Sequence, residues 1–264
     1  MKRMRVVLSV VAAALGGSLL AAGPAPAQEV QSLSSSGKTV HITRPGSYRL
    51  SHNVRLKGAG SAVVISVAGV SLDLNGHALI GPGGKQGTGI LVQGGHGVSV
   101  RNGTIQGFGF GVQVVNAFNV RIQGLQIDGE DGGGPPPGEV GIMILNSRGV
   151  EVSRNVISRV FLGVFVRGGS SGGNRIAENT LAAGASGQLG ICYNPDGLGS
   201  AEGPSGDLVY ANLVSGFNIG IQTSAESTGN IFRENDLAFL QVGIQELSSP
   251  GANVFAQNTE IDLD

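Results

Sequence analysis

A glycine followed by a β-branched residue recurs along the chain, and each pair introduces a short stretch in which apolar and other residues alternate. The spacings between successive pairs are 22, 30, 22, 27, 30 and 23 residues. Alternation is the period of a half-buried β-strand, and no helical periodicity follows residue 27. The pattern therefore predicts an all-β chain of many short strands. The pairs are Gly89-Ile90, Gly111-Val112, Gly141-Ile142, Gly163-Val164, Gly190-Ile191, Gly220-Ile221 and Gly243-Ile244.

Two further strands follow most of these pairs, the second of them after a turn that usually carries asparagine. The turn residues are Asn75, Asn102, Gly124, Asn155, Asn179, Asn212, Asn235 and Asn258, and their register varies by one residue. Three short strands per repeat describe a coil of a parallel β-solenoid, in which stacking alone buries the inner faces. Asparagine suits a turn with positive φ, and its amide can bond the next coil. We expect about eight coils, starting near Ala62.

The repeat length separates this solenoid from other kinds. A left-handed hexapeptide helix would repeat in multiples of six, and a leucine-rich repeat would need a leucine framework. Neither pattern is present. Coils of 22 to 23 residues with a few longer exceptions favour a right-handed single-stranded parallel β-helix.

Two stretches, "SAVVISVAGVSLDLNGHALIG" and "GTGILVQGGHGVSVRNGTIQGFGFGV", resemble the repeats of secreted bacterial right-handed β-helix proteins. These belong to the pectate-lyase-like superfamily, near the carbohydrate-binding and sugar-hydrolase repeats. The resemblance covers roughly residues 39–260. It implies the fold but no single activity, because pectate lyases, polygalacturonases, epimerases and non-catalytic adhesins share this architecture.

The ends of the chain have compositions of their own. Lys2, Arg3 and Arg5 precede an apolar run, and a small-residue site ends at Ala27, which predicts a signal peptide over 1–27. Residues 28–38 are expected to be a disordered leader. The β-helix domain is expected over 39–264, with 39–60 as its N-terminal edge. We therefore expect a secreted or periplasmic protein with no membrane span after signal removal.

The net charge and the cysteine content restrict which partners and which disulfides can be expected. After residue 27 the chain keeps 14 basic and 18 acidic residues, a net charge of −4. This balance gives no reason to expect nucleic acid as a partner. Cys192 is the single cysteine, which excludes an intramolecular disulfide and favours a buried small hydrophobe.

Two insertions, 128–139 and 194–207, adjoin the strand stack that contains the Gly-Ile pairs. The resemblance implies a substrate cleft on the outer face of that stack. By alternation this face is apolar in its middle with amides on either side, which would suit a sugar ring. We expect Phe165, Asn194 and Gln222 to bind substrate there.

A lyase reaction is one interpretation of the same region. Asp128, Glu130 and Asp131 could hold Ca²⁺, a hard cation that takes oxygen ligands and would neutralise a uronate carboxylate. Arg167 would then stabilise charge or act as the base, with Tyr193 as its helper.

Three other features of the sequence do not indicate a catalytic site. Asp73 and His77 have no counterparts in the next coil and read as a strand end and a turn. Gly95-His96-Gly97 resembles a short polygalacturonase element, but its acidic partners do not precede it. Without tryptophan, the tryptophan-containing motif of pectate lyases is absent as well.

Two classes of function follow. The chain reads as an exported β-helix repeat protein without a recognisable catalytic signature, either a surface or structural solenoid or a glycan-binding one. The alternative is a calcium-assisted polysaccharide (uronate) lyase or a related carbohydrate-active enzyme. A glycan-binding solenoid and a lyase would both have a polysaccharide as partner, whereas a purely structural solenoid would not need one.

Overall fold

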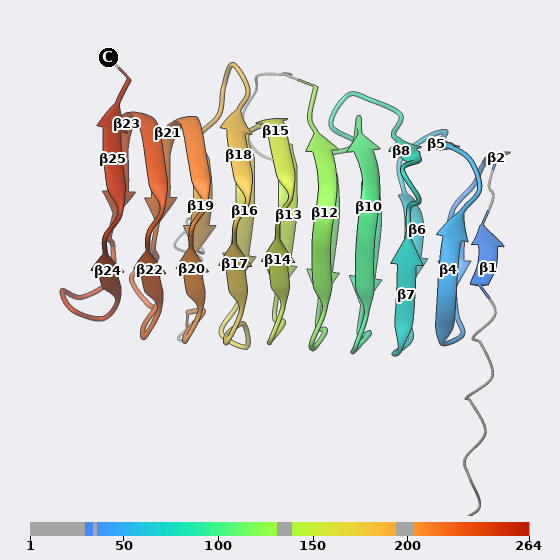
Figure 1. Ribbon diagram of the computed structural model, residues 1–264, viewed down its shortest axis with the longest axis horizontal. Helices are drawn as coiled ribbons and strands as arrows, with labels where there is room; N and C mark the ends of the chain where they lie inside the picture. Colours follow the sequence, from blue (N-terminus) through green and yellow to red (C-terminus); the bar gives the residue numbers. More distant parts are fainter. Residues whose placement is uncertain (1–29, 34–35, 131–138, 194–202, 264) are drawn as a thin grey trace, which may run out of the picture.

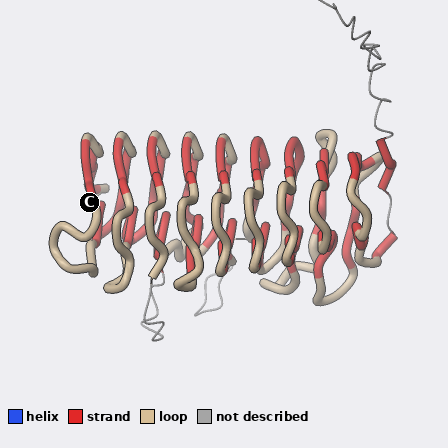
Figure 2. The backbone as a smooth tube through the Cα atoms, turned by 90° about the horizontal axis from the view of Figure 1, so that it is seen from below, coloured by secondary structure: helices blue, strands red, loops and turns tan. Residues whose placement is uncertain are grey.

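The protein is a parallel β-solenoid, seen here in a computed structural model that describes residues 30–33, 36–130, 139–193 and 203–263. These residues form 25 strands and no helix, and each strand pairs in parallel with its counterparts in neighbouring coils. The coils lie side by side in sequence order along the long axis (Figure 1), and the view from below shows the same row of coils (Figure 2). None of the described residues belongs to a helix able to cross a membrane.

Each coil contributes to three faces, and the first face contains the Gly-Ile strands. Its strands are β3 (Val40–Ile42), β6 (Ser61–Ile65), β9 (Thr88–Gln93), β11 (Phe110–Val115), β13 (Val140–Leu145), β16 (Leu162–Arg167) and β19 (Leu189–Tyr193), followed by the C-terminal parts of β21 (Leu213–Gln222) and β23 (Asp236–Gln245).

The second face follows in each coil. It consists of β1 (Val30–Leu33), β4 (Gly46–Leu50), β7 (Val70–Asp73), the N-terminal parts of β10 (Ser99–Gln106) and β12 (Arg121–Asp128), β14 (Glu151–Ser153), β17 (Arg175–Ala177), β20 (Leu208–Tyr210), β22 (Ile231–Arg233) and β24 (Val254–Ala256).

The third face completes the coil. It consists of β2 (Ser36–Gly37), β5 (Val54–Leu56), β8 (Ala78–Ile80), the C-terminal parts of β10 and β12, β15 (Val156–Val160), β18 (Thr180–Ala183), the N-terminal parts of β21 and β23, and β25 (Thr259–Asp262). We call the turns after the first, second and third faces the first, second and third corners.

The core is a set of axial rows of apolar side chains. Ile90, Val112, Ile142 and Val164 are paired in register on successive first-face strands, and all four are fully buried. Their neighbours in the strands alternate outward, as expected for strands with one buried face. The inward rows of the three faces meet in one continuous apolar cluster along the solenoid.

The repeated glycine allows two faces to approach each other closely. A Cβ on Gly89 would lie 2.4 Å from Cγ2 of Ile105, on the third face, and 2.5 Å from the carbonyl oxygen of Gly111 in the next coil. Gly111 stands in the same relation to Ile127. The glycine of the repeat is therefore required by packing against the third face.

The one-residue variation among the asparagines reflects two positions at the second corner. The first position has positive φ and carries Asn75, Asn102, Gly124, Arg154, Glu178, Ala211, Glu234 and Gln257. The next position carries Asn155, Asn179, Asn212, Asn235 and Asn258, and the preceding residue supplies the positive φ there. The expectation that turn asparagines themselves take positive φ holds for Asn75 and Asn102 and is wrong for these five.

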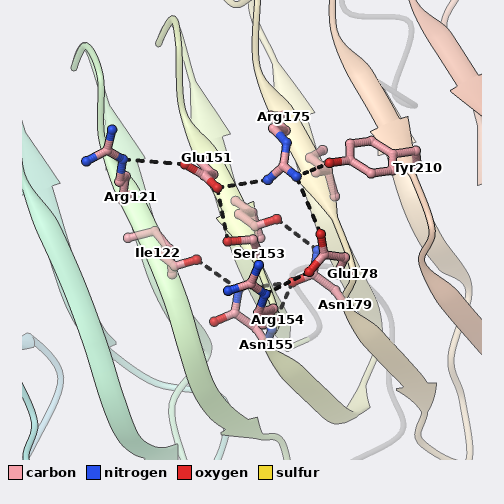
Figure 3. Close-up of polar contacts among 12 residues, drawn as sticks. Arg121, Ile122, Glu151, Ser153, Arg154, Asn155, Arg175, Glu178, Asn179 and Tyr210 are labelled. Carbon is pink, nitrogen blue, oxygen red and sulfur yellow. Dashed lines mark hydrogen bonds and ion pairs between the residues drawn. The ribbon is translucent and has the colours of Figure 1, made fainter.

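The five asparagines form a hydrogen-bonded ladder, part of which is drawn in Figure 3. Asn155 Nδ2 donates to Oδ1 of Asn179 at 3.0 Å and to the carbonyl of Ile122 at 3.0 Å. The same Asn179 Oδ1 also accepts the backbone N–H of Asn155 at 3.0 Å. The pattern repeats through Asn212, Asn235 and Asn258, so each buried amide in the ladder has its partners.

The N-terminal part departs from the expected boundaries. Val30–Leu33 and Ser36–Gly37 pair with β4 and β5, within the segment expected to be a disordered leader. Residues 39–60, expected to be an edge, supply a full coil, because β3, β4 and β5 each pair with the following coil. Pairing there satisfies backbone groups that a free edge would leave open. The described residues thus make about nine coils, close to the eight expected. The predicted signal peptide lies outside the described residues.

Replacing Asn179 by alanine should lower the free energy of unfolding by about 2 to 5 kcal/mol, because two buried donors of Asn155 lose their acceptor. Urea unfolding monitored by circular dichroism measures this loss. The control is Gln257→Gly, at an exposed positive-φ position of the same corner that glycine adopts readily, with an expected change below about 1 kcal/mol. Equal losses in the two variants would contradict the ladder's structural role.

Candidate functional site

The outer side of the first face is an apolar and largely buried surface. Phe165 is 8% exposed and Cys192 is fully buried, and both pack with Val140. Phe110, Met143, Leu162 and Leu189 complete this cluster. Phe165 lies on the outer row, as expected, but its ring is too buried to stack against a sugar ring.

The other residues expected to bind or react at this face differ in burial and in direction. Gln222 is 9% exposed and its Nε2 donates to Oε1 of Gln245. Arg167 ends β16, is half-buried, and has an interaction partner. Tyr193 points inward, where its ring packs edge-on against Phe232 at 5.5 Å, so its phenol is turned away from the outer surface. Asn194 lies outside the described residues.

A polar groove of about 330 Å³ lies at the third corner, near the N-terminal end of the solenoid. Its floor follows a single axial row, because Arg55 pairs with Ile80, Ile80 with Gln106, and Gln106 with Asp128. The walls are glycine-rich turn segments at 81–83, Gly107 and Gly129, and Arg159 closes one end. Arg55 and Asp128 are three coils apart, or roughly 14 Å at the spacing of paired strands.

Asp128 is fixed at one end of the groove. Its Oδ1 accepts hydrogen bonds from Ser158 Oγ at 2.9 Å and from Arg159 Nε at 2.8 Å, while Oδ2 pairs with Nη2 of Arg159. The hydrogen bond from the Arg159 guanidinium is the main cause that lowers the pKa of the Asp128 carboxyl below its ordinary value. Asp128 is therefore a permanently ionised acceptor at neutral pH.

Glu130 shapes the wall of the groove. Its Oε2 accepts the backbone N–H of Gly84 at 2.9 Å, and its own N–H donates to Oε1 of the buried Glu139 at 3.1 Å. Arg55 and Gln106, in contrast, are exposed and make no side-chain hydrogen bond or ion pair with any described residue. They are the two groove side chains whose donors and acceptor are open to a ligand.

The arrangement of the carboxylates does not fit a calcium site. Asp128 and Glu130 do line one groove, as the sequence predicted, but Arg159 occupies both oxygens of Asp128. A bidentate guanidinium competes directly with a metal ion for the same oxygens. No three metal-binding side chains converge among the described residues, and Asp131 lies outside them.

Asp73 has the structural role that its sequence context indicated. Its carboxylate accepts the N–H of Asn75 at 2.7 Å and Nδ2 of Asn102 at 3.0 Å, and it pairs with Arg101 at 3.2 Å. These contacts tie one turn to the next. His77 takes part through its backbone carbonyl, which accepts the N–H of Thr104 at 3.1 Å.

Sequence reasoning placed the cleft on the first face and missed the groove at the third corner. The signal was present in the third strands, where Gln106 and Asp128 align once the repeats are matched at Gly107 and Gly129. Arg55 was assigned to the N-terminal edge, so its place in the same axial row could not be seen.

Residues 40–259 match the family model described as "Right handed beta helix region", which confirms the predicted handedness. The chain is similar to an alginate lyase from Paenibacillus sp. str. FPU-7, with 14% identity and a TM-score of 0.55, covering 88% of this chain and 99% of that one. It is also similar to an endo-xylogalacturonan hydrolase from Aspergillus tubingensis, with 14% identity and a TM-score of 0.54, covering 86% and 68%.

A third similar structure is the enzymatically active domain of bacteriophage CBA120 tailspike protein 2. Its identity is 13% and its TM-score 0.57, covering 90% of this chain and 42% of that one. No curated protein sequence matches. At these identities the similarity shows a shared fold.

Asp128→Asn should reduce the loss of stability on acidification. The pKa of Asp128 is lowered in the folded protein, so its ion pair stabilises the fold above the ordinary pKa of 3.8 and this contribution is lost as pH falls through the lower folded value. Urea midpoints measured between about pH 6 and about pH 3 should fall less in Asp128→Asn than in the unaltered protein. Asp262→Asn, at an exposed acid of β25, is the control and should keep the unaltered slope.

Proposed function

The chain belongs to the right-handed β-helix family, and from this premise we propose that it is an exported, non-catalytic glycan-binding solenoid whose binding site is the third-corner groove. One observation carries the proposal. Arg55, Gln106 and Asp128 form an axial row of donors and acceptors, with Arg55 and Gln106 unengaged by described residues.

The form of the groove suits a linear ligand rich in hydroxyl groups. Paired strands repeat about every 4.8 Å. Gln106 and Asp128 are therefore one coil apart along the axis, and Arg55 lies two coils from Gln106 with Ile80 between them. A guanidinium donates, a carboxylate accepts, and a carboxamide does both, which together match hydroxyls. Solved structures with this fold include an alginate lyase and an endo-xylogalacturonan hydrolase, which supports a polysaccharide as ligand.

The chemistry of the groove favours binding over hydrolysis. A glycosidase needs one carboxyl group that stays protonated to donate to the leaving oxygen, usually through a raised pKa. Asp128 has the opposite environment, because Arg159 lowers its pKa. Export is inferred from the basic, apolar and small-residue pattern of residues 1–27.

The calcium-assisted lyase is the second candidate, and it rests on Asp128 and Glu130 lining one groove. Calcium would supply charge neutralisation of a uronate carboxylate. Because Arg159 holds Asp128, the described carboxylates do not fit that ion.

Oligosaccharide binding should weaken about tenfold when Gln106 is replaced by alanine, and to a similar extent in Arg55→Gln, since each loss removes about one hydrogen bond. A glycan array with the unaltered protein selects the ligand, and calorimetry then measures the variants. Arg121→Gln, at an exposed position of the second face, is the matched control and should bind normally. Equal binding by all four proteins would show that the third-corner groove is not the binding site.

Incubation with pectate or alginate in the presence of calcium should give no unsaturated product, read as ultraviolet absorbance. Product formation that is lost in Arg167→Ala would replace the binding proposal by a lyase whose site lies on the first face, away from Asp128 and Glu130. Product formation that survives this substitution would contradict both the binding proposal and the role expected for Arg167.

A further inference from the structure

The first corner carries a second side-chain ladder, which the asparagine pattern of the second corner did not reveal. Asn174, Asp207, Asn230 and Asn253 occupy equivalent positions in four successive coils and are all buried. Asn230 repeats the contacts of the other ladder, because it sends its N–H to Oδ1 of Asn253 at 3.1 Å and its Nδ2 to the same oxygen at 2.9 Å.

Asp207 interrupts this ladder, because it is an acid at a position where the neighbouring coils have amides. Its Oδ1 accepts the N–H of Asn174 at 2.8 Å, and its Oδ2 accepts Asn174 Nδ2 at 3.2 Å. Toward the next coil only its backbone N–H bonds, to Oδ1 of Asn230 at 2.9 Å. An ionised carboxylate has no proton to donate, so the side-chain link that an asparagine would make to Asn230 is missing.

The surroundings of Asp207 offer no compensating charge. Its side chain is 1% exposed, and no described lysine or arginine forms an ion pair with it. Asn174 and Asn230 face it as uncharged amides, and Tyr193, beside Cys192 on β19, is the titratable group that faces it. The buried Tyr193 hydroxyl lies close enough to influence the carboxyl but does not have the geometry of a formed hydrogen bond.

We propose that Asp207 is a pH-dependent joint in the first-corner ladder, which holds the coils of β17, β20 and β22 together when protonated and loosens them when ionised. Protonation removes an uncompensated buried charge. Ionisation restores that charge in a site that water does not reach. This inference is independent of the glycan proposal.

The direction of the pH effect follows from burial. Burial is the main cause that raises the pKa of Asp207 from 3.8 to about 6, and the bonds from Asn174 oppose it. The folded protein therefore keeps a proton that the unfolded chain releases. The contribution to stability is present below the ordinary pKa of 3.8, declines as pH rises to about 6, and does not change further above that.

Asp207→Asn tests the joint, because asparagine occupies this position in three neighbouring coils and can bond Asn230. Urea unfolding of the full chain is measured at about pH 4 and about pH 7.5. Over this range the ratio of the unfolding constant of the unaltered protein to that of Asp207→Asn should rise on the order of 10- to 100-fold. Asp236→Asn, at an exposed acid of the following coil, is the control and should keep the pH response of the unaltered protein.

A ratio that does not change with pH would overturn the proposal. A second measurement does not depend on the variant. Carboxyl carbon NMR of the unaltered protein should show a buried aspartate that titrates near pH 6, about two pH units above its ordinary value. Titration of Asp207 in the range of exposed aspartates would also overturn it.

Discussion

Every coil of this protein depends on the next one, because parallel pairing in register places each residue directly over its equivalent. Such stacking is favourable for apolar side chains and for amides, since an amide both donates and accepts. It is unfavourable for like charges. The same constraint explains the Asn155 ladder at the second corner and the buried Leu125 that precedes it, whose N–H donates to Oδ1 of Asn155. It also makes Asp207 the exception in its own ladder.

The constraint extends to the surface, where charges alternate along the axial rows. Glu151 lies between Arg121 and Arg175 on adjacent coils (Figure 3), with nitrogen–oxygen distances of 3.4 Å to Arg121 and 2.8 Å to Arg175. Arg175 also bonds the hydroxyl of Tyr210, one coil further on. Each exposed pair contributes little by itself, but alternation prevents a column of like charges that would oppose stacking. The pattern of surface charges therefore depends on the strand register, as the core rows do.

The residues that the repeat requires could be predicted from the sequence, and those that it merely tolerates could not. Glycine at the first face and asparagine at the second corner recur because packing and buried amides demand them, which was enough for the fold. The first-corner ladder was not recognised in the sequence because the coil before it carries valine at the same position, at Val150, and because Asp207 interrupts the series of asparagines. Gln106 and Asp128 could be aligned by matching the repeats, but Arg55 lies in the segment taken for an edge, so only the structure could show that it belongs to the same row. Alternation along the first-face strand turns Tyr193 inward, but it could not show that Asp207 lies beside it.

The placement of the groove follows from the same register. Because residues of different coils align along the axis, side chains that are distant in sequence converge in a line, and a ligand that contacts them all must extend along the solenoid. Asp128 and Arg159 neutralise each other at one end, and Glu130 is bound to the backbone of Gly84. Arg55 is then the cation of the groove without a described counter-charge. A chain of neutral sugars with an anionic group three coils from Asp128 would place that group beside Arg55. An anionic group beside Asp128 would instead face an ionised carboxylate.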